Sequence, residues 1–124
     1  MRILYLAVFV SLLGAPLQSQ QGRLCKGSPN LVGQCFKVHG RVYIANGGPQ
    51  MRIWRIGTDR LLGVVPSEDE IIPDNLSKAI FKEAGQWGEV YGDFEVCPFT
   101  KRKPEEMQMV CVESASHLVV KKNP

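Results

Sequence analysis

The sequence predicts a mostly β fold with one short helix, in the order strand, strand, strand, helix, strand, strand. Apolar and polar side chains alternate in several short runs, which is the period of a half-buried strand. Most of the 12 glycines and eight prolines fall between these runs, where turns are expected. A single segment spaces its apolar residues by four instead, which is the period of an amphipathic helix.

The clearest alternation follows Cys35, over residues 36–45. Gly40 falls in the apolar register of this strand, where the missing side chain allows the bend of a strongly coiled barrel strand. The turn residues Asn46, Gly47, Gly48 and Pro49 then end the run. Two further short strands are expected next, over residues 51–56 and 61–65.

The helix is predicted after an acidic loop at residues 66–70. Asp74 or Asn75 can cap its N-terminus, its body covers residues 76–84, and Gly85 is a natural C-terminal stop.

The last two strands are predicted over residues 89–99 and 107–112, with a short terminal strand at residues 118–120. If the first two pair about a centre at Pro104, Cys97 lies opposite Cys111.

This order of elements resembles the OB-fold, a small Greek-key barrel with its helix between the third and fourth strands. The resemblance is architectural, covers roughly residues 35–120, and rests on no diagnostic motif. It implies a small OB-like barrel, and an open antiparallel sheet with one packed helix is the alternative.

The first 19 residues read as a secretory signal peptide: Arg2 supplies the positive charge, and residues 3–14 form an apolar run. A run of this length is too short for a membrane anchor, which needs about 20 residues. A lipid-attachment signal is disfavoured by Arg23, two residues before Cys25. We therefore expect an exported protein, periplasmic or secreted, without a membrane span after cleavage. The expected organisation is a signal peptide at residues 1–19, an irregular segment at 20–34, a single β-rich domain at 35–120 and a basic tail at 121–124.

Four cysteines in a small exported chain predict two disulfides. Three pairings are possible, and we expect the two local ones, Cys25–Cys35 and Cys97–Cys111. The cysteine spacings do not match a thiolate zinc site, and there is no C-x-x-C redox motif, so neither a metal nor a cofactor is expected.

The candidate binding residues share the polar faces of the first two strands. Aromatic rings there can stack on a ligand while cations contact its negative groups. The alternative is that Trp54 fills the core and that the arginines solvate its rim. The candidates are Lys37, His39, Arg41, Tyr43, Arg52 and Trp54.

The sequence favours a disulfide-stabilised binding or structural domain, expected to be a monomer, over an enzyme, and no catalytic residue is assigned. Loss of Arg2 with the signal lowers the formal charge from +3 to +2, which argues neither for nor against a polyanion. An exported protein is an unexpected partner for nucleic acid, so a protein, peptide or glycan is favoured. The alternatives are a hydrolase using Asp93 and Glu95, or an inhibitor that presents residues 46–50 or 101–106 to a secreted enzyme.

Overall fold

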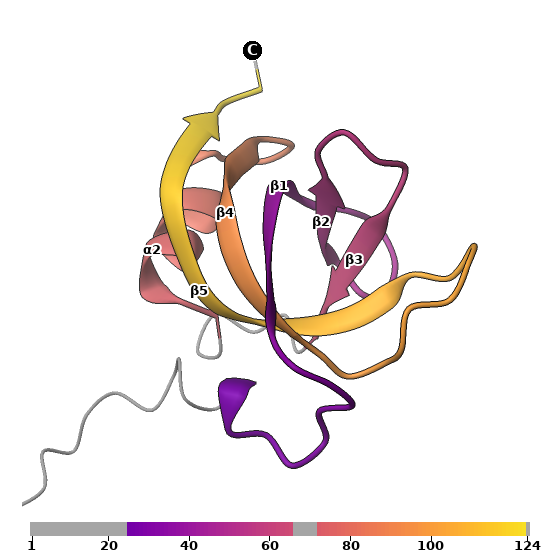
Figure 1. Cartoon of the computed structure of the whole chain (residues 1–124). Helices are drawn as coiled ribbons and strands as arrows, with labels where there is room; N and C mark the ends of the chain where they lie inside the picture. The colour runs from indigo at the N-terminus through magenta and orange to yellow at the C-terminus, as the bar shows by residue number, and fades with distance from the viewer. Residues whose placement is uncertain (1–24, 66–71, 124) are drawn as a thin grey trace, which may run out of the picture.

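Five strands close into a small barrel in the order β1-β2-β3-β5-β4, with a short helical segment between β3 and β4 (Figure 1). The computed structural model describes residues 25–65 and 72–123. The predicted signal peptide and the acidic loop at residues 66–70 lie outside the described residues. The OB-like barrel is thus confirmed, and the open sheet is not formed.

The strands run antiparallel to their neighbours, except that β3 and β5 pair in parallel. This parallel pair closes the barrel, because β3 would otherwise be an edge strand. The elements are β1 Phe36–Ile44, β2 Met51–Arg55, β3 Leu61–Val64, α2 Asp74–Ser77, η1 Lys78–Glu83, β4 Glu89–Pro98 and β5 Gln108–Lys121.

The helical segment starts at Asp74 and changes from an α-helical to a π-helical turn at Lys78. Leu76 and Ile80 lie four apart and are buried against the barrel core, as the helical period predicts. Asn75 anchors the start of the segment, since its side-chain amide donates a hydrogen bond to the Ala115 carbonyl at 2.7 Å. No helix in the described part of the chain has the length and apolarity to cross a membrane.

The fifth strand differs from its prediction, because it is one continuous strand of 14 residues. The sequence predicted a short strand at 107–112 and a separate short terminal strand at 118–120. The structure instead keeps these residues paired with β4 and absorbs the irregularity in shifts of register, one of them between Tyr91 and Asp93. Such bulges add a residue to one strand and bend it.

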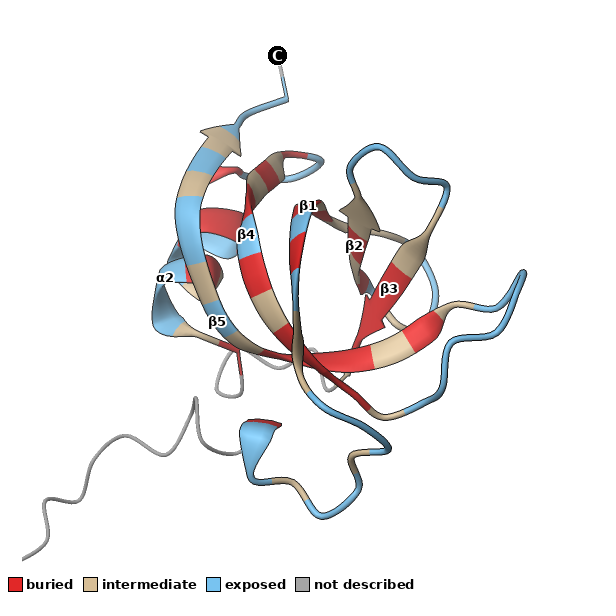
Figure 2. Ribbon diagram, viewed as in Figure 1, coloured by how far each residue is buried: buried red, intermediate tan, exposed pale blue. Residues whose placement is uncertain are grey.

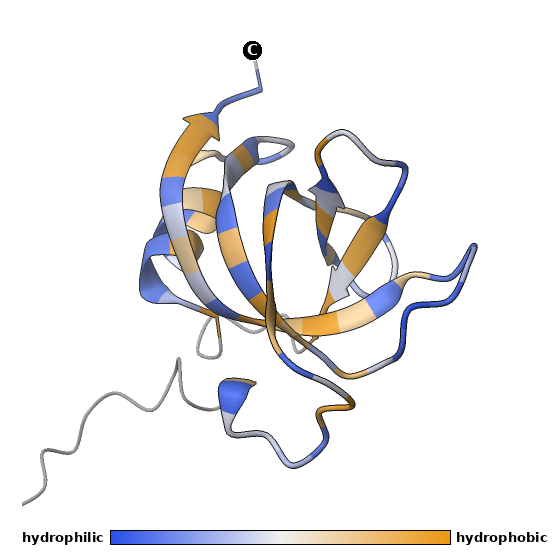
Figure 3. Ribbon diagram, in the orientation of Figure 1, coloured by the Kyte–Doolittle hydropathy of each residue, from blue (hydrophilic) through white to orange (hydrophobic). Residues whose placement is uncertain are grey.

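The barrel core forms from the apolar residues of the alternating runs, as Figures 2 and 3 show along β4 and β1. Val38 and Val42 from β1 are buried, as are Phe94 and Val96 from β4. Their polar neighbours in the sequence point outward. Trp87 follows the helical segment but does not close the core, since 58% of its surface is exposed. It lies in the Gly85–Gly88 turn with a φ of 67°.

Close packing at one crossing of the barrel requires glycine. Gly40 on β1 lies opposite Gly92 on β4. A Cβ atom at Gly40 would lie 2.5 Å from Ile53 Cγ2 and 3.1 Å from the Trp54 carbonyl oxygen. The predicted bend role of Gly40 therefore has a steric cause, since neighbouring strands approach too closely there for any side chain.

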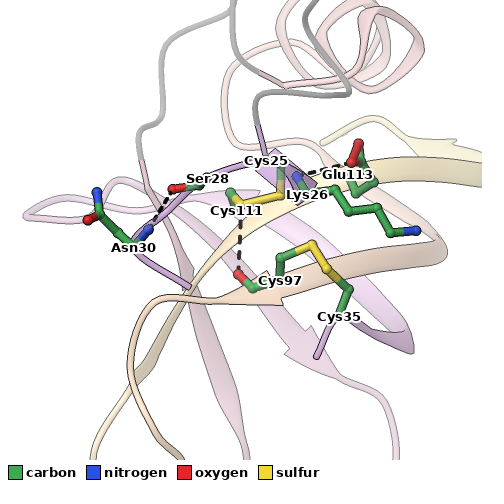
Figure 4. Close-up of a disulfide and its surroundings, with 8 residues drawn as sticks. All are labelled: Cys25, Lys26, Ser28, Asn30, Cys35, Cys97, Cys111 and Glu113. Atoms are coloured by element: carbon green, nitrogen blue, oxygen red, sulfur yellow. Dashed lines mark hydrogen bonds between the residues drawn. A yellow bond between two sulfur atoms is a disulfide. The ribbon is translucent and has the colours of Figure 1, made fainter. Parts of the chain in front are cut away.

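The two disulfides of the structure differ from the two that the cysteine spacing predicted. The bonds are Cys25–Cys111 and Cys35–Cys97, with sequence separations of 86 and 62 residues. Figure 4 shows both bonds side by side, one joining the segment before β1 to Cys111 on β5 and the other joining it to Cys97 on β4. The Cys25–Cys35 and Cys97–Cys111 pairings are therefore wrong.

The predicted register behind the wrong pairing is nevertheless present. Cys97 lies opposite Cys111, and the Phe99 amide donates a hydrogen bond to the Met109 carbonyl oxygen, as a centre at Pro104 requires. The two cysteines point outward beside each other, and the segment before β1 covers them. Each then bonds to that segment instead of to its cross-strand neighbour. The result is a second buried cluster outside the barrel, formed by Cys25, Cys97 and Cys111 with Leu31, Cys35 and Phe99 packed against it.

Candidate functional site

The outer face of β1 and its two neighbours carries the predicted binding residues. Lys37, His39, Arg41 and Tyr43 all point outward from β1, since Val38, Gly40 and Val42 between them are buried. The strand register places other chemistry-bearing side chains directly beside them. Trp54 and Arg52 on β2 lie opposite Arg41 and Tyr43, and Asp93 and Glu95 on β4 lie opposite His39 and Lys37.

Both histidines of the chain meet one carboxylate on this face. The Nδ1 atom of His39 lies 2.8 Å from Oδ1 of Asp93, and the Nδ1 atom of His117 lies 3.0 Å from Oδ2 of the same side chain. We call His39, Asp93 and His117 the imidazole cluster. A cleft of about 390 Å³ opens beside it, with Lys37 and Ser116 among its lining residues.

A β-bulge brings His117 to this cluster. Asp93 pairs with Ser116, whereas Tyr91 pairs with Val119, so β5 carries one residue more than β4 over this interval. Ser116 and His117 are consecutive and both exposed, which a regular strand does not allow. His117 also has a φ of 53°, the left-handed region that non-glycine residues rarely adopt. The bulge therefore re-aims the imidazole toward Asp93.

The electrostatics of the cluster keep Asp93 ionised. The hydrogen bond from His39 holds the pKa of this carboxyl below its usual value, and the nearby charges of His39 and His117 act in the same direction. A carboxylate of this kind accepts hydrogen bonds or binds a cation, whereas a general acid needs a raised pKa. Glu95, its partner in the hydrolase hypothesis, instead forms an ion pair with Lys26 at 3.6 Å. The geometry therefore gives no support to an acid–base pair of Asp93 and Glu95.

A second group lies beside the imidazole cluster on β1 and β2. The Arg41 guanidinium lies 4.7 Å from the ring centre of Trp54 and 5.5 Å from that of Tyr43, which are cation–π distances. We call these three residues the aromatic cluster. Glu89 balances the charge of Arg41 at 3.6 Å, and Arg41 Nε is buried without a hydrogen-bond partner among the described residues. The alternative that Trp54 fills the core does not hold, because its ring is partly exposed on the outer face.

The remaining predicted residues have different surroundings. Arg52 donates a hydrogen bond from Nε to the Pro49 carbonyl oxygen at 3.2 Å, so it holds the turn between β1 and β2. Lys37 is exposed and lines the cleft beside His39. The Trp54 indole is fixed by its own hydrogen bond to the Thr58 carbonyl oxygen at 2.6 Å.

A separate cleft of about 650 Å³ lies between the β2–β3 turn and the β4–β5 loop. Its lining mixes charges of both signs, including Arg60, Arg102 and Glu105. Burial lowers the pKa of Arg60, and the nearby charge of Arg102 acts in the same direction. The loop at residues 101–106, considered above as an inhibitory loop, forms one wall of this cleft.

Sequence reasoning missed His117, although the strand pattern carried a signal for it. Two consecutive polar residues, Ser116 and His117, interrupt the alternation between Ala115 and Leu118, as a bulge does. Among the described residues, Cys25, Cys97 and Cys111 have sulfur atoms within 4.8 Å of one another, but all three are consumed by disulfides. Comparison with family models, with curated proteins and with solved structures finds no match to this chain.

Proposed function

We propose that this chain is an exported, monomeric binding domain whose aromatic cluster contacts an acidic oligosaccharide. The observation that carries the proposal is the stack of Arg41 over the rings of Trp54 and Tyr43 on the outer face of the barrel. The apolar face of a sugar packs against aromatic rings, and a guanidinium donates paired hydrogen bonds to a carboxylate or sulfate.

The position of the cluster also supports this function. OB-type barrels bind extended ligands across their second and third strands and the adjoining loops. Trp54 is on β2, directly opposite both Arg41 and the first residue of β3, Leu61.

Two disulfides support the exported location, because such bonds persist in oxidising compartments. The predicted signal peptide at residues 1–19 points to the same location. A periplasmic chain and a fully secreted chain are equally compatible with these features.

The test is calorimetric titration of the untagged, oxidised chain with a heparin-derived hexasaccharide and an alginate-derived hexasaccharide. Cellohexaose tests the need for charge, and the oligonucleotide dT6 tests nucleic acid as a ligand. Trp54→Ala should weaken acidic-sugar binding by about 5-fold or more, since loss of a ring that stacks on a nucleic-acid base costs about 1–3 kcal/mol and we expect a comparable loss for a stacked sugar.

Trp87→Ala is the matched control, because Trp87 is an exposed tryptophan outside the aromatic cluster. It should leave binding unchanged. Equal losses in the two variants, or binding of dT6 in preference to both acidic sugars, would contradict the proposal.

A further inference from the structure

We propose that the imidazole cluster is a binding site for a divalent transition-metal ion, and Zn²⁺ is the ion used to test it. The cluster combines two imidazoles and one carboxylate, the ligand types that Zn²⁺ and Cu²⁺ take from proteins. This site lies on β1, β4 and β5, and it does not depend on the sugar-binding proposal.

The geometry of the three side chains suits a shared ion. Each imidazole meets its own oxygen of Asp93, at 2.8 Å for His39 and 3.0 Å for His117. Two donor atoms of one tetrahedral metal ion lie about 3.4 Å apart when each bond is about 2.1 Å. Each ring nitrogen is therefore within about 0.6 Å of the distance from its carboxylate oxygen that joint coordination requires.

Binding requires the two rings to rotate toward each other. The donor atoms of the three residues do not all lie within 4.8 Å of one another. Both imidazoles have room to rotate, because 61% of the His39 side chain and 82% of the His117 side chain are exposed. The cleft beside them leaves space for the water molecules that would complete the coordination shell.

The backbone of His117 argues that the cluster does more than stabilise the fold. A non-glycine residue in the left-handed region is strained, and such strain is concentrated at ligand sites and active sites. The contact with Asp93 joins two exposed groups, and a contact of that kind adds little to stability. A strained bulge beside an exposed contact is therefore more typical of a residue kept for a ligand than of one kept for the fold.

The charges around the site favour a cation only moderately. Glu95 on β4 is negative but is paired with Lys26, and Lys37 on β1 is positive and lines the same cleft. The hydroxyl groups of Ser114 and Ser116 on β5 are uncharged. The metal affinity must therefore come from the three ligands themselves, so removal of any one of them should weaken metal binding strongly.

The test is titration of the untagged, oxidised chain with Zn²⁺ at pH 7.5 by calorimetry, with Mg²⁺ as the comparison ion. One Zn²⁺ should bind per chain, and Mg²⁺, which prefers all-oxygen sites, should not compete. His39→Gln, His117→Gln and Asp93→Asn should each weaken Zn²⁺ binding by about 10- to 100-fold or more.

Glu89→Gln is the matched control, because it removes an outward carboxylate of the same strand that contacts Arg41 and Tyr91 and neither imidazole. It should leave Zn²⁺ affinity unchanged. NMR provides a readout that needs no variant, since the chain has two histidines and both sets of ring resonances should shift together with Zn²⁺.

Full Zn²⁺ affinity in any one of the three ligand variants would overturn the proposal. A shift of the ring resonances of one histidine alone, or the absence of Zn²⁺ binding at 100-fold molar excess, would also overturn it.

Discussion

Removal of the outer disulfide provides the sharpest test of the architecture. The Cys35–Cys97 loop lies wholly inside the Cys25–Cys111 loop, so the two crosslinks are nested. With the inner bond intact, the outer bond closes a ring of 24 residues, the difference between the separations of 86 and 62. A ring of that size restricts the unfolded chain by about 3.5 kcal/mol in the chain-entropy model.

The double variant Cys25→Ser/Cys111→Ser should therefore lose about 3.5 kcal/mol of unfolding free energy, and not the larger value of about 4.6 kcal/mol expected for an isolated 86-residue loop. Urea unfolding without reductant measures this loss. Thiol titration of the same variant in urea should find no free thiol, because Cys35 and Cys97 remain bonded to each other.

The local pairing makes a different prediction for the same protein. It would break both crosslinks in this variant and leave Cys35 and Cys97 without their partners. Two free thiols would refute the reasoning. So would a peptide joining Cys97 to Cys111 in a non-reducing digest of the wild-type chain, a measurement that holds even if the variant does not fold.

Three further substitutions test packing and charge. Gly40→Ala should destabilise the chain by about 1–3 kcal/mol in urea unfolding, because the new methyl group meets Ile53 at 2.5 Å, and an unchanged midpoint would contradict this steric cause. Phe94→Ala should cost about 3–5 kcal/mol as a fully buried ring, whereas Phe81→Ala, whose ring is 44% exposed, should cost less than about 1 kcal/mol; similar losses would argue against the core assignment. Burial raises the pKa of Glu113, so the folded state favours the neutral carboxyl. The stability that this group adds is therefore present below its unfolded pKa and is lost as the pH rises through its folded pKa. Glu113→Gln should therefore raise the melting temperature at pH 7 and have no effect at pH 3, and an effect of equal size at both values would rule out this cause.

Local periodicity was sufficient to predict most of the barrel. Alternation gave the inward and outward faces of β1 and β4, and the four-residue spacing of Leu76 and Ile80 gave the buried face of the helix. These features follow from adjacent residues, so a single sequence contains the information. The register of the last hairpin was also accessible, because one short connection determines it.

The disulfide pairing was not accessible in the same way. Correct register placed Cys97 opposite Cys111, but bonding also depended on where the segment before β1 runs. That segment is irregular, and no pattern in it indicates that it covers the outer side of β4 and β5. Its position is fixed by distant contacts, such as the hydrogen bond from the Val32 amide to the Pro98 carbonyl oxygen. Short spacing therefore favoured the wrong partners.

The imidazole cluster shows how a failure of periodicity can itself be informative. His39 and Asp93 are 54 residues apart, and only the pairing of β1 with β4 makes them neighbours. His117 joins them through the bulge that also broke the alternation of β5 and made it read as two strands. A regular strand would have placed an outward residue at Ser116 and turned His117 toward the barrel. The β-bulge that made β5 difficult to recognise in the sequence thus also assembles the imidazole cluster, because a strictly alternating β5 could not direct the His117 imidazole at Asp93.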